Sequence, residues 1–477
     1  MANLAFCYKN GEGIEKDHSK AVYWFHKAAD LDDSDAMSNL AFCYKNGEGI
    51  EKDHSKAVYW FQKAADLDDS DAMANLAFCY KYGQGIEKDH LKAVYWLQKA
   101  ADLGHSYAMS NLAFCYKNGE GIEKDHSKAV YWFQKAADLG HSYAMSNLAF
   151  CYKYGQGIEK DHLKAVYWLQ KAADLGHSYA MSNLAFCYKY GEGIQEDQSK
   201  AMYWAQKAAD LGHSDAMFNL AICYYNEEGI QKDQSKAVHW YQKAADLGHS
   251  NAMSNLAFCY KYGKGIQKDQ SKAVHWYQKA ADLGRSTAMV NLAHCYNYGQ
   301  GIEKDHLKVV CWLQKAADLG HSGAMYILGD CYYNGEIIEK DHSKAVYWYQ
   351  KAADLGQSNA MVNLAHCYYN GEGIEKDHSK AVYWYQKVAH LGHSGAMAHL
   401  GDCYSNGEGI QEDHSKAVYW YQKAANLGDS DAMSNLAFYY KYGEGITKNY
   451  SKAVCWLQKA ANLGESNAEV QLKSMLK

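Results

Sequence analysis

The chain of 477 residues contains no proline, although average usage would supply roughly two dozen. No stretch rich in glycine and serine, no block of like charge and no shift in composition divides it. Such segments mark domain boundaries, so their absence favours one continuous domain over residues 1–477. Length alone would instead suggest two to four domains.

Other absences concern the partners of the chain. No apolar run approaches the roughly 18 residues of a membrane-spanning helix, and the N-terminal MANLAFCYKN does not resemble a signal peptide. Lys and Arg number 49 against 55 Asp and Glu, with the signs interspersed. A nucleic-acid-binding protein would carry a basic stripe. We therefore expect neither membrane insertion nor nucleic-acid binding.

Thirteen tryptophans are present, and each neighbouring pair, from Trp24 to Trp456, is separated by 36 residues. A fixed period of this size is typical of repeat proteins in which stacked copies bury a continuous core. The spacing is free of insertions and deletions, which predicts about thirteen equivalent structural units along the chain.

Each copy predicts a helix–loop–helix unit. In the copy from residue 108 to 143, Ser106 is expected to cap the first helix and Asp125 the second, while Gly119 and Gly121 turn the chain. Apolar residues at helical spacing predict the buried side of the second helix, namely Ala129, Trp132, Phe133, Ala136 and Leu139. The expected fold is all-α, an elongated α/α solenoid of about thirteen 36-residue repeats.

The last half-repeat, residues 466–477, departs from the pattern. It keeps Leu472 but carries Glu469, Lys473 and Ser474 where other copies have Met, Ala and Phe. A helix with one polar side suits the end of a stack, so we expect a C-terminal capping helix here, with decay of the repeat as the alternative.

The shared positions read Ala-x3-Leu-Ala-x2-Tyr-x2-Gly-x-Gly-Ile-x2-Asp-x2-Lys-Ala-x2-Trp-x2-Lys-Ala-Ala-x2-Gly. This pattern resembles the Sel-one-like repeat (SLR), a variant of the tetratricopeptide hairpin with a unit two residues longer. One departure is Ala113, where the family usually has Gly, as at Gly329 and Gly401. The resemblance implies an α/α superhelix that holds partner proteins together, without shared catalytic residues.

The fourteen cysteines are expected to be reduced. Twelve share one column, from Cys7 to Cys403, on the apolar side of the first helix. Equivalent helices in stacked repeats lie too far apart for disulfides, which need Cα atoms within about 7 Å. Some secreted bacterial relatives carry a second cysteine column that pairs within each hairpin, and this chain lacks it. Buried thiols predict a reducing, cytoplasmic compartment.

No metal, cofactor or active site is expected. Of the 23 histidines, nine lie in the loop column from His18 to His414 and seven in the inter-repeat turns from His105 to His393. Such ladders do not converge on one ion, as zinc requires. The Gly-x-Gly-Ile loop lacks the strand and GK[ST] of a phosphate loop. No polar group stands apart from the repeated columns, which argues against an enzyme.

Candidate binding residues lie where the copies differ, on a first-helix face that lines the groove of tetratricopeptide arrays. One column is mostly Phe but becomes His or Asp in four later repeats, and its neighbour is mostly Asn. Phe could instead be core, and Asn could bond within the array. The candidates are Asn111, Phe114, Asn147, Phe150, Asn291, His294, Asp330, Asn363, His366 and Asp402.

The predicted function is a non-catalytic scaffold or adaptor that binds partner proteins or extended peptides. Repeats from residue 216 onward are the more individual, so the most specific site is expected around His294, Asp330, His366 and Asp402, with drift at exposed positions as the alternative. Two other functions remain open. In the first alternative, the array is a mechanical spacer without a ligand. In the second, it is the regulatory region of a larger signalling protein such as a kinase.

Overall fold

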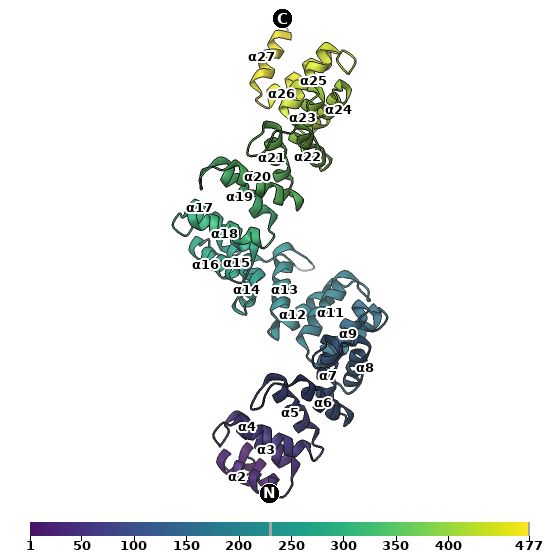
Figure 1. Cartoon of the computed structure of the whole chain (residues 1–477), viewed down its shortest axis with the longest axis vertical. Coiled ribbons are helices and arrows are strands. Elements are labelled where there is room, and N and C mark those ends of the chain that lie inside the picture. The colour runs from purple at the N-terminus through teal and green to yellow at the C-terminus, as the bar shows by residue number, and fades with distance from the viewer. Residues whose placement is uncertain (229–230, 476–477) are drawn as a thin grey trace. The chain divides into compact units, whose positions relative to one another are not determined.

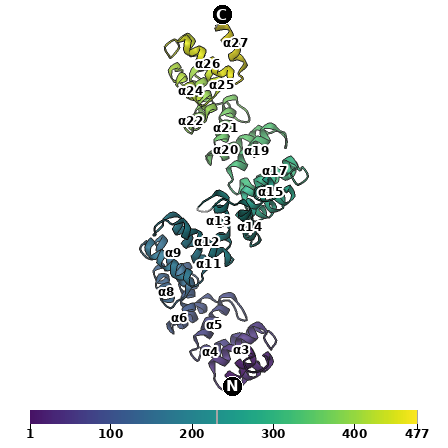
Figure 2. The same cartoon turned by 180° about the vertical axis from the view of Figure 1, so that it is seen from behind.

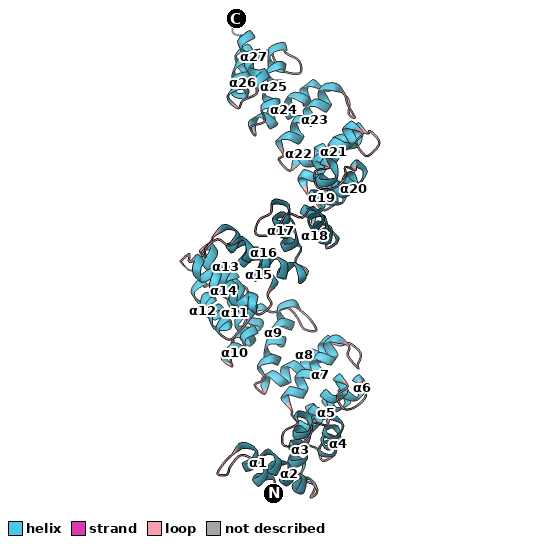
Figure 3. Cartoon of the chain, turned by 90° about the vertical axis from the view of Figure 1, so that its left-hand side faces the viewer, coloured by secondary structure: helices cyan, strands magenta, loops and turns pink. Residues whose placement is uncertain are grey.

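The structure is a computed structural model that describes residues 1–228 and 231–475. These residues form 27 α-helices joined by turns and short loops, with no strand among them (Figure 3). The all-α fold predicted from the 36-residue period is confirmed. Each odd-numbered helix from α1 to α25 packs against the even-numbered helix that follows it; we call such a pair a repeat, with a first and a second helix (Figure 1).

The chain divides into two compact units, residues 1–247 and 248–477. The first helices of the first unit are α1 (Ala2–Asn10), α3 (Ser34–Asn46), α5 (Ser70–Tyr82), α7 (Ser106–Asn118), α9 (Ser142–Tyr154), α11 (Ser178–Tyr190) and α13 (Ser214–Asn226). Its second helices are α2 (His18–Ala29), α4 (His54–Ala65), α6 (His90–Asp102), α8 (His126–Asp138), α10 (His162–Asp174), α12 (Gln198–Asp210) and α14 (Gln234–Asp246).

The second unit continues the same alternation (Figure 2). Its first helices are α15 (Ser250–Tyr262), α17 (Ser286–Tyr298), α19 (Ser322–Asn334), α21 (Ser358–Asn370), α23 (Ser394–Asn406), α25 (Ser430–Tyr442) and the final α27 (Ser466–Met475). Its second helices are α16 (Gln270–Asp282), α18 (His306–Asp318), α20 (His342–Asp354), α22 (His378–His390), α24 (His414–Asn426) and α26 (Tyr450–Asn462).

Most helices begin after a residue whose side chain accepts a hydrogen bond from a backbone N–H of the first helical turn. Asp125 precedes α8 in an extended conformation and accepts a hydrogen bond from the backbone N–H of Lys128, as predicted. The first helix of the same repeat differs from the prediction. Its cap is His105, whose Nδ1 accepts from the N–H of Ala108, while Ser106 is already helical. An imidazole nitrogen therefore replaces the hydroxyl that the sequence suggested.

The two glycines of the loop have different tasks. Gly119 ends α7 in the left-handed conformation, with φ of 78°, and its N–H bonds to Cys115. Gly121 also has a positive φ, and a Cβ at this position would lie 2.3 Å from the carbonyl oxygen of His90 in the preceding repeat. The second glycine is therefore required for repeats to approach each other closely.

The core consists of the apolar sides of stacked helices. Leu112 and Phe133 are fully buried, and Trp132 is 7% exposed. The predicted buried stripe of α8 is right except for Leu139, which is 58% exposed because it follows the end of the helix rather than lying on its inner side.

All fourteen cysteines are free thiols. Eleven of the twelve column members, from Cys43 to Cys403, are buried, which confirms the prediction for them. Cys7 is half-buried because no helix precedes α1 within the described residues, and Cys311 and Cys455, outside the column, are exposed. Burial raises the pKa of the Cys43 thiol to about 11, so this thiol stays protonated at neutral pH.

The last helix, α27, buries Ala468 and Leu472 and exposes Glu469 and Lys473. This is the one-sided pattern expected of a capping helix; residues 476 and 477 of the predicted cap lie outside the described residues. The cap and the single domain over 1–477 stay predictions. No helix in the described part of the chain is long and apolar enough to cross a membrane.

Candidate functional site

The Asn column, the Phe column and a column of lysines lie on one side of the first helices. In α7 they are Asn111, Phe114 and Lys117, spaced three apart so that they lie on the same side of the helix. Tyr154 and Tyr190, which end their helices and contact Phe150 and Phe186, adjoin these columns, and we call the whole surface the first-helix face. All ten candidate residues from the sequence lie on it, in α7, α9, α17, α19, α21 and α23.

The Phe column is neither core nor free surface. Phe114 and Phe150 are half-buried, whereas Phe186, Phe258 and Phe438 are 43%, 41% and 46% exposed. The partial exposure inferred from His and Asp in this column is therefore confirmed.

The Phe rings pack in two ways, depending on the last residue of their helix. Where the helix ends in Asn, the ring meets a second-helix Phe edge to face, as for the pair Phe114 and Phe133 with ring centroids 5.5 Å apart. Where it ends in Tyr, the ring tilts onto that Tyr, as for Phe150 and Tyr154 at 4.5 Å.

Lysines connect the Phe rings of successive repeats in the first unit. Lys117 Nζ lies 5.8 Å from the Phe114 ring and 4.6 Å from the Phe150 ring. Lys153 lies 4.6 Å from the Phe186 ring and also pairs with Glu192 at 2.8 Å. Such cation–π contacts contribute about 0.5–1 kcal/mol each at exposed sites. This lysine column, which the sequence reasoning missed, contacts the Phe ring of the next repeat at Lys45, Lys117 and Lys153.

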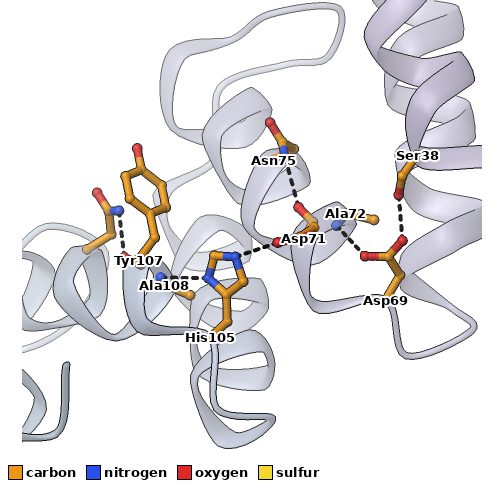
Figure 4. A network of polar contacts seen from close by, with 9 residues as sticks. Ser38, Asp69, Asp71, Ala72, Asn75, His105, Tyr107 and Ala108 are labelled. Atoms are coloured by element: carbon orange, nitrogen blue, oxygen red, sulfur yellow. Dashed lines mark hydrogen bonds and ion pairs between the residues drawn. The ribbon is translucent and has the colours of Figure 1, made fainter. Parts of the chain in front are cut away.

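The Asn column bonds mainly within its own helix. The amide nitrogens of Asn111, Asn147 and Asn291 each donate to the carbonyl oxygen four residues earlier, at 2.9 Å. Figure 4 shows the same bond for Asn75, beside the Asp69 and His105 caps. From the sequence, a hydrogen bond within the array was the alternative role of these Asn residues, but the expected acceptor was a neighbouring loop. The amide donor is thus engaged, which weakens the expectation that these residues pair with a peptide backbone.

The two Asp residues of the Phe column are bound within the array. Asp330 accepts a hydrogen bond from the Tyr349 hydroxyl at 2.7 Å and from Asn363 Nδ2 at 3.1 Å. Asp402 accepts from Tyr421 at 2.7 Å and from Asn435 at 3.4 Å. Each carboxylate therefore ties its own second helix to the next repeat.

The sequence features that could have indicated these contacts are Gly329 and Gly401, which replace the Ala found in the other repeats. A Cβ at Gly329 would lie 2.5 Å from the ring of Tyr349, so only glycine lets this ring reach the carboxylate. Burial, followed by the bond to Asp330, raises the pKa of Tyr349, so the phenol remains a donor at all physiological pH.

The two His candidates are exposed and contact different neighbours. His294 Nδ1 lies 3.3 Å from Lys261 Nζ, and partial loss of solvent around the ring, followed by the lysine charge, lowers its pKa. His366 Nε2 lies 2.8 Å from Asn370 Nδ2. The structure joins Asp330 to Asn363 but does not gather the other candidates. Within the described residues, no three His, Cys, Asp or Glu side chains are grouped as metal ligands.

Comparisons with known proteins agree with this architecture. The chain is similar to a protective antigen of uropathogenic Escherichia coli with an SLR fold, at 28% identity over 94% of this chain and 97% of that one, with a TM-score of 0.69. It is also similar to a Sel1 repeat protein from Oxalobacter formigenes, at 27% identity over 66% and 93% of the two chains, with a TM-score of 0.53.

A search of curated proteins finds no match. The Sel1 repeat profile, in contrast, matches thirteen consecutive segments from residues 1–33 to residues 430–465, with boundaries that follow the helix pairs. The chain therefore belongs to the Sel1 repeat family, within the tetratricopeptide-like helical repeats.

Proposed function

We propose that this protein is a non-catalytic scaffold that binds a partner protein along the first-helix face. The observation that carries the proposal is the row of exposed aromatic side chains there. Phe186 and Tyr190 are 43% and 57% exposed, and Tyr154 is 56% exposed. Contiguous exposed apolar area in a stable protein is typical of an interaction surface.

Lysines give this face a second property. Lys45, Lys117 and Lys153 lie against the Phe rings of the next repeat, so cation and ring are adjacent at these three positions of the first unit. An extended segment with carboxylates and apolar side chains would meet matching groups at Lys45 and Lys117, which form no ion pair within the described residues, whereas Lys153 already pairs with Glu192. The partner class that fits best is therefore an extended acidic and apolar segment of another protein.

The candidate residues of the later repeats are secondary contacts in this proposal. Asp402 is 40% exposed at its side chain and His366 is exposed, so both could also contact a partner. Replacing Asp330 or Asp402 would leave Tyr349 or Tyr421 without its acceptor, however, so such variants would test folding as well as binding.

The buried free thiols support a reducing compartment, and we propose a cytoplasmic location on that basis. The alternative functions give different outcomes in one experiment. A spacer array would bind no partner through this face, and a regulatory region would bind a domain encoded on the same polypeptide.

The test is affinity capture with matched variants. Phe150→Ala with Tyr154→Ala alters the first-helix face, and Tyr131→Ala with Tyr167→Ala removes two rings from second helices that are 51% and 50% exposed, close to the 56% of Tyr154. We expect captured partners to be lost from the first variant and kept by the second, with equal helicity by circular dichroism. Equal capture by both variants would contradict the proposal.

A further inference from the structure

The sixth repeat contains a cavity that is much larger than its counterpart nearby. It lies among α11, α12 and α13, within the first unit, and has a volume of about 180 Å³. The corresponding space in the third repeat, beside Phe78, Tyr82 and Leu97, is about 40 Å³. Phe186, Tyr190, Met202 and Ala205 line the larger cavity.

The lining of the larger cavity contains one unusually small residue. Ala205 occupies a second-helix column that elsewhere holds a large side chain, namely Phe25, Phe61, Leu97, Phe133, Leu169, Tyr241, Tyr277, Leu313, Tyr349, Tyr385, Tyr421 and Leu457. Where the first helix ends in Tyr, as α11 does at Tyr190, this column holds Leu in four repeats and Tyr277 in a fifth. The atoms beyond Cβ are absent at Ala205 alone, and the packing around it does not close the space.

The mouth of the cavity also differs. In the third repeat, Tyr107 from the following repeat lines the smaller space. At the same position after the sixth repeat the residue is Asp215, which is not part of the lining. Phe186 and Tyr190 are both exposed and both line the cavity, so it opens onto the first-helix face.

The rim carries polar groups without net charge. Lys189 lines the cavity and pairs with Glu228 at 2.6 Å, so its charge is compensated. Asn219 also lines it and is exposed, and within the described residues its side chain forms no hydrogen bond, unlike Asn183 one repeat earlier, which bonds to Tyr179. A free amide beside an apolar cavity suits a ring that bears one hydroxyl.

We propose that the cavity beside Ala205 is an anchor pocket that receives one aromatic side chain of a bound partner, with Tyr preferred over Phe. An apolar cavity of about 150 Å³ is large enough to bind a benzene ring, so this space can hold one ring. In the third repeat Leu97 occupies most of the equivalent space, whereas the space beside Leu457, against the last helix, is about 380 Å³. The proposal rests on the proposed function, because the partner must lie on the first-helix face.

The first experiment uses p-cresol and toluene, the side-chain analogues of Tyr and Phe, with the full chain. We expect both to bind wild type in NMR titrations, p-cresol more tightly. Ala205→Leu, which restores the residue of Leu169, should weaken p-cresol binding about tenfold or more because it fills the space. Ala205→Val should give an intermediate loss, which keeps the test valid if the Leu variant folds poorly. No binding of either compound to wild type overturns the proposal.

The second experiment separates a partner side chain from a free small molecule. The peptide Gly-Ser-Gly-Tyr-Gly-Ser-Gly should compete with p-cresol for wild type, and the same peptide with Ala in place of Tyr should not. If p-cresol binds but the Tyr peptide does not compete, the cavity takes free aromatic compounds and the anchor proposal is wrong.

Partner capture distinguishes failure of this proposal from failure of the proposed function. If Ala205→Leu captures the same partners as wild type with equal affinity, the anchor is wrong while the scaffold function stands. If Phe150→Ala with Tyr154→Ala also leaves capture unchanged, the proposed function is wrong, whatever p-cresol does.

Discussion

The hydroxyl of Tyr349 donates a 2.7 Å hydrogen bond to Oδ1 of Asp330, nineteen residues earlier in the same repeat. Gly329 makes this contact possible, because a Cβ there would lie 2.5 Å from the tyrosine ring. The same three residue types recur as Gly401, Asp402 and Tyr421. Glycine, aspartate and tyrosine therefore act as one structural set in these two repeats.

Removing the Tyr349 hydroxyl should destabilise the second unit. Tyr349→Phe leaves Asp330 with one donor fewer, so we expect a loss of about 1–3 kcal/mol in the free energy of unfolding, seen as faster hydrogen exchange in α19 and α20. Tyr277→Phe is the matched control, because the Tyr277 hydroxyl is buried and has no hydrogen-bond partner among the described residues. That change should be neutral or stabilising; equal losses in both variants would contradict the role of Asp330.

Glu227→Gly should stabilise the first unit. Glu227 ends α13 with φ of 68°, a conformation that costs a side-chain-bearing residue about 1–2 kcal/mol. Glycine has no such cost, so the urea midpoint should rise. Asp68→Gly is the control: Asp68 also has a positive φ, of 61°, but Asp tolerates this region better. A rise no larger for Glu227→Gly than for Asp68→Gly would argue against backbone strain at Glu227.

The histidine caps should make stability depend on pH. His141 and His177 accept backbone hydrogen bonds at Nδ1, which requires an unprotonated nitrogen, and burial lowers the pKa of both rings. In the unfolded chain these rings titrate near pH 6.5. Their contribution is therefore complete above that pH and is lost as pH falls through the lower folded pKa.

This dependence can be removed by substitution. Asp69 holds the equivalent capping position in an earlier repeat, so His141→Asp with His177→Asp should keep the caps while removing the two histidine titrations. We expect a smaller drop in melting temperature between pH 7 and pH 5 than in wild type. An unchanged drop would assign the pH dependence to other groups.

Two thiols should react quickly in native buffer. Cys311 and Cys455 are exposed, Cys7 is half-buried, and the other eleven cysteines are buried. Labelling with a thiol reagent, followed by mass spectrometry, should therefore find Cys311 and Cys455 first, and the buried column only in denaturant. Fast native labelling of Cys115 or Cys259 would contradict the packing of the first helices.

The sequence predicted what repeats in every copy and missed what depends on contacts between copies. The 36-residue period and Asp125 led directly to paired, capped helices. The need for Gly121 was not visible, because it comes from the backbone of His90 in the preceding repeat. His105 was not recognised as a cap, because a histidine adopts that role only when its ring faces the helix end.

The candidate site was predicted in part. The Phe column was correctly inferred to be partly exposed, since it contains His and Asp in other repeats. Its connection by Lys117 and the binding of Asp330 to Tyr349 depend on side-chain direction, which residue types alone do not give. The cavity at Ala205 was visible only as one small residue in a column of large ones, and its meaning required the packing.

Site-specific photo-crosslinking tests the central claim, that partners bind the first-helix face, most directly. A photoreactive phenylalanine analogue would replace Tyr154 or Tyr190 on that face and, in separate chains, Tyr131 or Tyr167 on second helices, all between 50% and 57% exposed. In cells that produce the protein, we predict discrete crosslinked partner bands from the first pair and none from the second. Equal crosslinking at both pairs, or none from the first-helix face, would contradict the account.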